Sequence, residues 1–507
     1  MEGGVLMKVV VLVAYVVMMV VVIVFTAKKN LTLNGFLLGG RSIGPWMSAF
    51  SYGASYFSAV IIVGYAGSTG WSVGLSAIWC GIGNALIGSL LAWSLLAKPT
   101  RRIGERLQVG TLPSFFEKRY NSKLLKIIAS LIIFVFLLPY SASVYKGLGT
   151  MFSMAFHFDY TWAVVGIALL ASIYLFAGGY KATAITDFIQ GSIMLVGIVA
   201  VVVYIVNAAG GVSAGLAMLG TPEIGGAEMN TLWPPKGKEV WLFSNVILTS
   251  LGVLGMPQMI HKFFAIRDES SVKRATVIST VFALILAGGA YFAGSFGRVV
   301  INAISPDMAA QLNAGTMSKD LIMPTILTDS VVVKIPEIML GLFVVLLLSA
   351  SISTLTALVL SSSSVLTLDL IGSFAPKMKP KTSLWTMRSL CVAFVLFSLA
   401  VNFLMQNTPI ISLMSLSWGT IAGAFLAPFL YGLLWRGVTK AGAFTGVLCG
   451  ALISLIPPLV SGNMALAPIS GAAAMLSSLV IVPVVSLLTK KTGYSKEHLD
   501  AVFGTAQ

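Results

Sequence analysis

The chain has 507 residues, of which 57% are hydrophobic and only 10% are charged. This composition is typical of a polytopic membrane protein and excludes an ordinary soluble globular protein. The formal net charge is +15. Whether this charge indicates binding to polyanions depends on where the basic residues lie along the chain.

Thirteen apolar segments are long enough to cross a bilayer as helices, which takes about 20 residues each. In chain order they cover approximately residues 5–27, 45–69, 72–97, 124–153, 160–178, 183–207, 241–261, 276–303, 334–370, 386–406, 410–434, 441–460 and 467–488. The first segment lacks a small-residue cleavage site, so we expect a retained helix and no signal peptide. The sequence therefore predicts an all-α polytopic membrane protein with about 13 transmembrane helices.

Most of the 32 Lys and Arg residues fall in alternate loops between these segments, and Lys262 is counted among them. Basic residues accumulate in cytoplasmic loops, so this asymmetry predicts a multi-pass protein of the cell (inner or plasma) membrane, N-out and C-in. The positive charge then sets the orientation in the lipid bilayer, and we expect no nucleic-acid partner.

Two of the predicted spans are interrupted by small residues or proline. The second contains "SYGASYFSA" at 51–59, with Gly53 in it, and the seventh contains "TSLGVLGMPQ" at 249–258. A pair of broken helices at matching positions of two halves indicates a midplane binding site in a secondary transporter. Broken helices expose backbone groups that lipid cannot satisfy, so a bound ion or ligand is expected there. Packing glycines and a proline kink are the alternative.

The segment "SASISTLTALVLSSSS" at 349–364 carries nine hydroxyl groups in sixteen residues. Ala350, Ser353 and Thr354 are spaced i, i+3 and i+4, which places them on one face of a helix. Hydroxyl and carbonyl oxygens without a full charge suit a hard monovalent cation such as sodium, whereas zinc favours His or Cys and calcium favours several carboxylates. The alternative is that these hydroxyls bond back to their own helix.

Asp187 lies within a predicted span, and an intramembrane carboxylate is a functional candidate by default. Its alternative role is an interfacial charge or a partner of a helix N-terminus. No HExxH, GxSxG or phosphate-binding GxxxxGK[ST] motif occurs, so no catalytic residues and no enzyme activity are predicted. No organic cofactor is expected either.

Several stretches resemble the sodium:solute symporter family over nearly the whole chain. They are "GFLLGGRSIGPW", "SYGAS", "GGYKATAITDFIQG", "GMPQMIHKFFA" and the hydroxyl-rich segment. The resemblance implies a leucine-transporter-type five-plus-five inverted repeat. It divides the chain into an extra N-terminal helix with a cytoplasmic loop (1–44), a first repeat (45–207), an extracellular loop (208–240), a second repeat (241–434), two extra C-terminal helices (435–488) and a cytoplasmic tail (489–507).

The resemblance also implies ion ligands. Those of the sodium site are the backbone carbonyls of Ala54 and Phe57 together with Ala350, Ser353 and Thr354. Some family members bind a second sodium, and the matching residues here are Asp187, Ser353 and Thr356. Ala357 stands where such a member can carry a hydroxyl, which leaves the second site open.

Tyr56, Tyr140, Thr249, Pro257 and Trp418 are the candidates for lining a solute pocket. The apolar run 58–64 argues against a sugar, because a polyhydroxylated solute needs many polar partners.

We therefore expect a sodium-coupled symporter, acting as a monomer, that imports an organic acid, amino acid or vitamin-like solute by alternating access. A proton-coupled carrier that uses Asp187, or a transporter-like sensor or channel, is the alternative.

Overall fold

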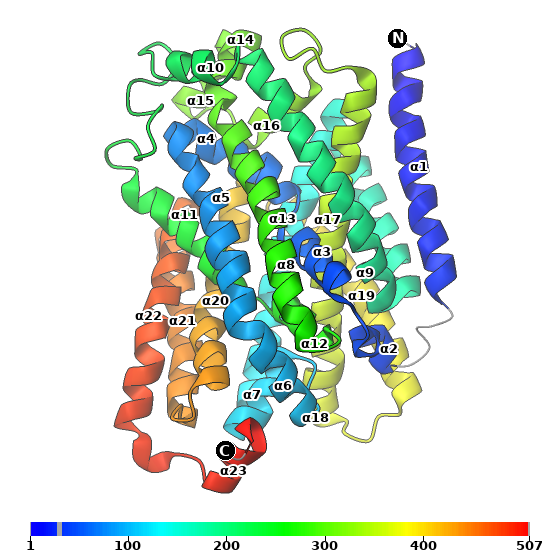
Figure 1. Cartoon of the computed structure of the whole chain (residues 1–507), viewed down its shortest axis with the longest axis vertical. Helices are drawn as coiled ribbons and strands as arrows, with labels where there is room; N and C mark the ends of the chain where they lie inside the picture. The colour runs from blue at the N-terminus through cyan, green and yellow to red at the C-terminus, as the bar shows by residue number, and fades with distance from the viewer. Residues whose placement is uncertain (1, 28–32, 505–507) are drawn as a thin grey trace.

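The structure is a computed structural model that describes residues 2–27 and 33–504. Within these residues the protein is predominantly helical, and the only β interaction is an isolated bridge between Ile43 and Ile266. The long helices lie side by side along one axis, and the described chain starts and ends at opposite ends of it (Figure 1). Residue 1, residues 28–32 of the expected first loop and residues 505–507 of the expected tail lie outside the described residues.

The first half of the chain contains the first broken helix and two long helices. Its α-helices are α1 (Glu2–Ala27), α2 (Leu33–Leu38), α3 (Pro45–Tyr56), α4 (Gly67–Val73), α5 (Ile78–Ala85), α6 (Lys98–Arg106), α7 (Leu112–Tyr120), α8 (Lys123–Phe156) and α9 (Tyr160–Ala208). Between α3 and α4 runs a π-helical stretch, Val60–Ala66. The helical structure of the second predicted span, 45–69, continues through α4 to Val73, four residues beyond its predicted end.

Helix α9 is too long to be one straight span. Its 49 residues would extend about 74 Å, roughly twice the thickness of a bilayer core. The side chains of Tyr174 and Thr186, twelve positions apart, are hydrogen-bonded to each other. Such positions lie about 18 Å apart in a straight helix, so α9 reverses its direction between them. This agrees with the expected pair of spans at 160–178 and 183–207.

The second half of the chain contains the second broken helix. Its α-helices are α10 (Val212–Leu219), α11 (Glu239–Leu251), α12 (Pro257–Ala265), α13 (Ser270–Ser295), α14 (Gly297–Ile304), α15 (Pro306–Ala314), α16 (Ile322–Thr328), α17 (Glu337–Ser364), α18 (Gly372–Phe374), α19 (Pro380–Leu404), α20 (Ile410–Leu434), α21 (Lys440–Ser461), α22 (Ala467–Leu488) and α23 (Lys496–Phe503). The two longest expected external loops contain short helices, α10 in one and α15 and α16 in the other.

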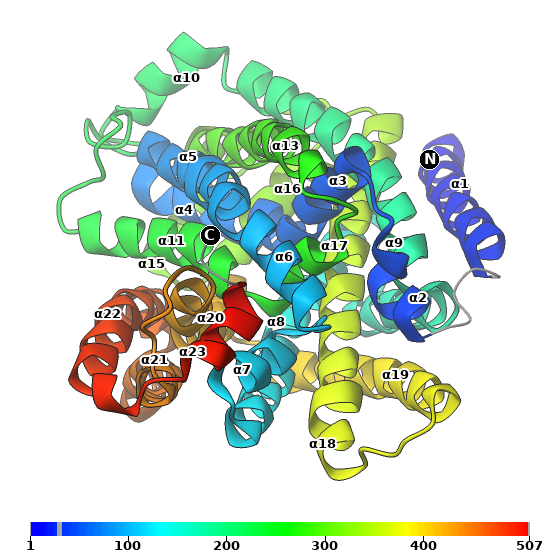
Figure 2. The same ribbon diagram turned by 60° about the horizontal axis from the view of Figure 1, so that its bottom comes forward.

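Helices α17 and α20 form the centre of the bundle. In their most apolar windows 83% of the residues of α17 and all of those of α20 are buried inside the protein. The corresponding window of α19 is only 33% buried. The hydroxyl-bearing residues of α17 are therefore enclosed by the protein itself. Figure 2 shows the ribbon of α17 among those of α3, α8 and α9.

Nine helices of the described chain are long and apolar enough to span a membrane, or ten if the bent pair α11 and α12 is one span. Two shorter apolar stretches, Lys8–Val22 and Tyr160–Tyr174, add to these. The protein is thus a multi-pass membrane protein. The count of thirteen, the orientation and the division of the chain into repeats and tail stay predictions.

Close backbone contact fixes the position of α4, the second half of the first broken helix. A Cβ atom on Gly70 of α4 would lie 1.9 Å from the carbonyl oxygen of Gly294 on α13, and a Cβ on Gly294 would lie 2.1 Å from that of Ala66. Only glycine permits this approach of two helices.

We predict that Gly70→Ala lowers the stability of the protein by about 1–3 kcal/mol, because the added methyl forces two backbones apart. The measurement is the apparent melting temperature of the purified protein in detergent. Gly166→Ala is the matched control, since nothing lies within 4 Å of the position of its Cβ atom. An unchanged melting temperature for Gly70→Ala would show that the two helices do not pack this closely.

Candidate sodium and solute site

The first broken helix stops in the middle of the protein. Helix α3 ends at Tyr56, and Phe57 takes an extended conformation with φ −106° and ψ 115°. A helix that stops leaves the carbonyls of its last turn without intrahelical partners. Gly53 is not the cause of the break: it lies within α3, where a Cβ atom would come within 2.4 Å of the Phe282 ring. For this glycine the packing interpretation is the correct one.

Helix α17 places hydroxyl groups beside the unpaired carbonyls of α3. The hydroxyl of Thr354 lies 3.4 Å from the carbonyl oxygen of Ala54, 3.2 Å from that of Ser55 and 3.0 Å from that of Ala350. Thr354 is fully buried. Three of the five predicted sodium ligands, from two different helices, therefore meet at one point.

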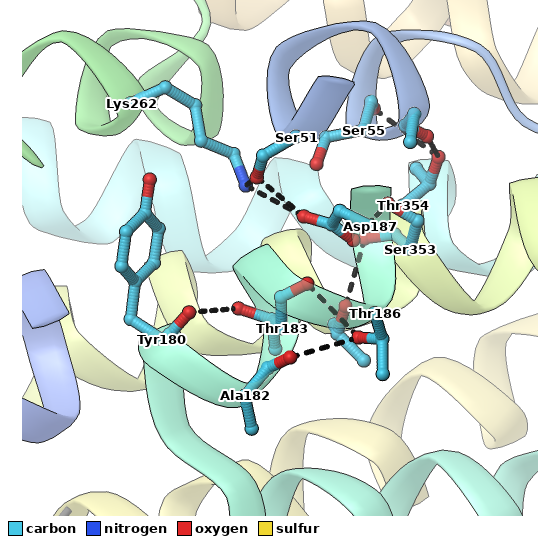
Figure 3. A network of polar contacts seen from close by, with 12 residues as sticks. Ser51, Ser55, Tyr180, Ala182, Thr183, Thr186, Asp187, Lys262, Ser353 and Thr354 are labelled. Carbon is cyan, nitrogen blue, oxygen red and sulfur yellow. Dashed lines mark hydrogen bonds and ion pairs between the residues drawn. The ribbon is translucent and has the colours of Figure 1, made fainter. Parts of the chain in front are cut away.

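The neighbouring residue on α17 reaches a buried carboxylate. Ser353 donates a hydrogen bond to Asp187 Oδ1 at 2.6 Å, and Ser51 of α3 donates to Asp187 Oδ2 at 2.5 Å. Asp187 comes from α9 and is 1% exposed, so its carboxylate is enclosed by the protein. Figure 3 shows this carboxylate between the three helices. Asp187 and Ser353 of the predicted second sodium site thus lie together, whereas the hydroxyl of Thr356 bonds back to the carbonyl of Ser353 at 2.9 Å.

Lys262 was expected in a cytoplasmic loop, and this expectation is wrong. The side chain belongs to α12, is 3% exposed and places its Nζ atom 3.5 Å from Asp187 Oδ2. Helix α12 extends to Ala265, so Lys262 is still inside the protein where the sequence had placed the end of a span. A sequence signal existed, because an intramembrane carboxylate such as Asp187 needs a partner.

The second broken helix meets the first through a side chain. Helix α11 gives way to a 3-10 turn, Gly252–Gly255, and Met256 is extended before Pro257 begins α12. The two halves are bent by 44°, as the Gly and Pro residues predicted. Tyr56 of α3 donates a hydrogen bond to the carbonyl oxygen of Thr249 on α11 at 2.6 Å. This hydrogen bond joins the two broken helices beside the position where α11 ends.

A small cavity lies at this junction. It has a volume of about 10 Å³ and is lined mainly by Tyr56, Tyr65, Asn84, Tyr140, Thr249 and Tyr291. Such a volume holds about one water molecule, so the protein is closed around it. Every described residue that lines the cavity is uncharged.

Trp418 of α20 packs against two of the lining tyrosines. Its ring stacks on Tyr56 with centroids 6.1 Å apart and lies edge-to-face with Tyr140 at 5.7 Å. Of the five predicted pocket residues, Tyr56, Tyr140 and Thr249 line the cavity, whereas Trp418 and Pro257 do not. Asn84 was not predicted, although its side-chain amide lies 3.2 Å from the Tyr56 hydroxyl; a buried Asn in an apolar span is the signal that could have identified it.

A larger cavity of about 460 Å³ is lined by Ser72, Trp241, Lys319 and Ser412, among others. Lys319 lies outside the spans and donates a hydrogen bond to the Ser72 hydroxyl at 2.9 Å. Burial lowers the pKa of Lys319 to about 8, because it disfavours the charged ammonium. This second cavity, unlike the central one, has a basic side chain in its lining.

The solved structures that match the chain are helical transporters. A sodium-coupled sialic acid symporter, solved substrate-bound and outward-open, superposes with a TM-score of 0.77 at 17% sequence identity, covering 95% of this chain and 97% of that one. MhsT in complex with L-phenylalanine superposes with a TM-score of 0.53 at 14% identity, covering 88% and 98%. At these identities the likeness shows the fold alone, and that fold is the leucine-transporter type predicted from the sequence.

Curated relatives match at higher identity. A sodium/proline symporter of Staphylococcus aureus is 31% identical over 501 residues, which is 95% of this chain and 93% of that protein. A sodium/proline symporter of strain JH9 is 32% identical over 478 residues, covering 91% and 88%. The family model for the sodium:solute symporters matches residues 36–450. The chain with the broken helices, the buried hydroxyls and the closed central cavity therefore belongs to the sodium:solute symporter family.

Proposed function

We propose that the protein imports a small amino-acid-like solute together with sodium by alternating access. The observation that carries the proposal is the meeting of the α3 break with the α17 hydroxyl groups at Thr354. Membership in the sodium:solute symporter family supports the coupling to sodium. The relatives named sodium/proline symporter support a proline-like solute.

Sodium suits the oxygens gathered at the break. Two carbonyls, of Ala54 and Ala350, lie within hydrogen-bond reach of the Thr354 hydroxyl. We propose that sodium binds among them, with the Phe57 carbonyl and the Ser353 hydroxyl as further ligands. Uncharged oxygens can replace part of the hydration shell of a monovalent cation and still release it, as a coupling ion requires.

Binding of this ion would couple to the movement of the helices. A ligand shifts a conformational equilibrium only by its different affinity for the two states. Sodium bound between α3 and α17 would stabilise the conformational state in which these two helices are in contact. The ion would bind from outside, complete the solute site and then leave into the cytoplasm with the solute.

The free energy of one sodium ion is sufficient for accumulation. One charge crossing 100 mV releases about 2.3 kcal/mol, and a tenfold sodium gradient adds about 1.4 kcal/mol. Together they support an accumulation of a solute without net charge by about 500-fold.

The central cavity limits the chemistry of the solute. All described lining residues are uncharged, and most are aromatic or hydroxyl-bearing. A solute with a net charge would leave that charge without a partner in a desolvated site. A zwitterionic amino acid has no net charge, and its carboxylate can interact with the neighbouring sodium. We therefore favour an amino acid over an organic acid.

Uptake of radioactive L-proline into proteoliposomes tests the proposal. We expect accumulation that requires an inward sodium gradient and stops when choline replaces sodium. Accumulation in sodium-free buffer that follows the pH gradient would contradict sodium coupling and favour a proton-coupled carrier using Asp187. Sodium binding without transport of any amino acid would favour a sensor.

We predict that Thr354→Val raises the sodium concentration for half-maximal uptake about tenfold, because it removes one oxygen ligand worth roughly 1–1.5 kcal/mol. The matched control is Thr367→Val. Thr367 is equally buried and follows α17 without a break, and its hydroxyl bonds back to the carbonyl of Ser363 at 2.8 Å. Equal sodium dependence of the two variants would contradict the assignment of Thr354.

We predict that Tyr56→Phe raises the KM for L-proline about tenfold, because it removes the hydrogen bond that holds the two broken helices at the cavity. Tyr52→Phe serves as the control on the same helix. The Tyr52 hydroxyl is also buried and donates to the carbonyl of Gly88 at 2.6 Å, but Tyr52 is not among the residues that line the cavity. Should both variants change the KM alike, the cavity would not be the solute site.

A further inference from the structure

Lys262 is the cation closest to the buried carboxylate of Asp187 in the described chain. Its Nζ atom lies 3.5 Å from Asp187 Oδ2 and donates a hydrogen bond to the Ser51 hydroxyl at 2.7 Å. Ser51 in turn donates to the same carboxylate oxygen at 2.5 Å. Figure 3 shows the ammonium group, the hydroxyl and the carboxylate in sequence. Among the described residues, Lys262 is the one basic side chain that forms an ion pair with Asp187.

The surroundings of Lys262 fit a resident cation. The Nζ atom lies 5.1 Å from the centre of the Tyr180 ring, whose face attracts a positive charge. Both Lys262 and Asp187 are almost fully buried. Burial of a single charge is strongly unfavourable, whereas a pair with additional hydrogen bonds is tolerated. The carboxylate thus has its charge balanced within the protein.

The ion pair adjoins the proposed sodium site without occupying it. Ser353 donates to the other carboxylate oxygen, Oδ1, at 2.6 Å. Thr354, the next residue, contacts the carbonyls of Ala54 and Ser55 instead. The hydroxyl of Thr356, which completes the second sodium site expected from the sequence, is turned toward the carbonyl of Ser353. The oxygen atoms of the expected second sodium site therefore already form hydrogen bonds within the protein.

We infer that the Lys262 ammonium takes the place of a second sodium ion beside Asp187, so that each transport cycle is coupled to a single sodium. The inference rests on the proposed sodium-coupled transport and fixes its stoichiometry. A second sodium at Asp187 would place two cations beside one carboxylate, and their mutual repulsion opposes binding. Removal of the ammonium charge leaves a carboxylate with two hydroxyl neighbours, which is a site that sodium can fill.

Equilibrium binding of radioactive sodium to the purified full-length protein, with choline as the competing ion, tests the inference. We expect one sodium per chain for the wild type and two for Lys262→Met. The double variant Lys262→Met/Asp187→Asn, which loses both charges, should bind one again. Lys262→Arg keeps the positive charge and should also bind one. Lys273→Met, at an exposed position of α13, controls for the loss of a lysine.

Each outcome decides the inference. Two sodium ions bound by the wild type, or one bound by folded Lys262→Met, would overturn it. If Lys262→Met does not fold in choline, sodium in the buffer should restore its folding, because sodium replaces the lost cation. Sodium should likewise restore the folding of Lys262→Gln, which also lacks the ammonium charge. If Lys262→Met and Lys262→Gln both fail to fold even in sodium, while Lys262→Met/Asp187→Asn folds, sodium does not replace the Lys262 ammonium and the inference is contradicted.

The same experiment separates this inference from the proposed function. A wild type that binds no sodium would disprove sodium coupling itself, whatever Lys262 does. A wild type that binds two sodium ions would leave sodium-coupled transport standing and disprove only the role of Lys262.

Discussion

A helix that stops inside a membrane protein leaves carbonyl oxygens that neither lipid nor its own backbone can satisfy. In this chain α3 stops at Tyr56, and the buried Thr354 hydroxyl of α17 stands beside the released carbonyls of Ala54 and Ser55. A hydroxyl has one proton to donate, so it cannot satisfy several carbonyls at once. A bound monovalent cation can contact several carbonyl oxygens at once, which is the physical basis of the proposed sodium site.

The polar contacts around this point join the elements that a carrier has to move. Ser353 connects α17 to Asp187 of α9, and Lys262 connects α12 to the same carboxylate. Tyr56 connects the two broken helices to each other. The proposed sodium site, the Lys262–Asp187 ion pair and the central cavity all involve residues that contact α3. A change at one of them is therefore expected to alter the relative stability of the two proposed states.

The sequence predicts the helical fold, both broken helices and the shared face of Ser353 and Thr354, because helix periodicity and clusters of small residues, Gly or Pro are local properties. The exact position of the first break could not be predicted, since Gly53 lies inside α3 and serves packing, while the chain becomes extended only at Phe57. Lys262 was misplaced for a related reason. Lys262 is buried because α12 continues past it to Ala265. The length of this helix inside the bundle depends on tertiary packing, which the local sequence does not reveal.

The central claim is that a monovalent cation binds between the broken α3 and the hydroxyl groups of α17. Its most direct test is a crystal structure of the protein in thallium(I) salt, since this monovalent cation scatters X-rays anomalously. The account predicts an anomalous peak in contact with the carbonyl of Ala54 and the hydroxyl of Thr354. A well-ordered map with no anomalous peak between these two groups would contradict it.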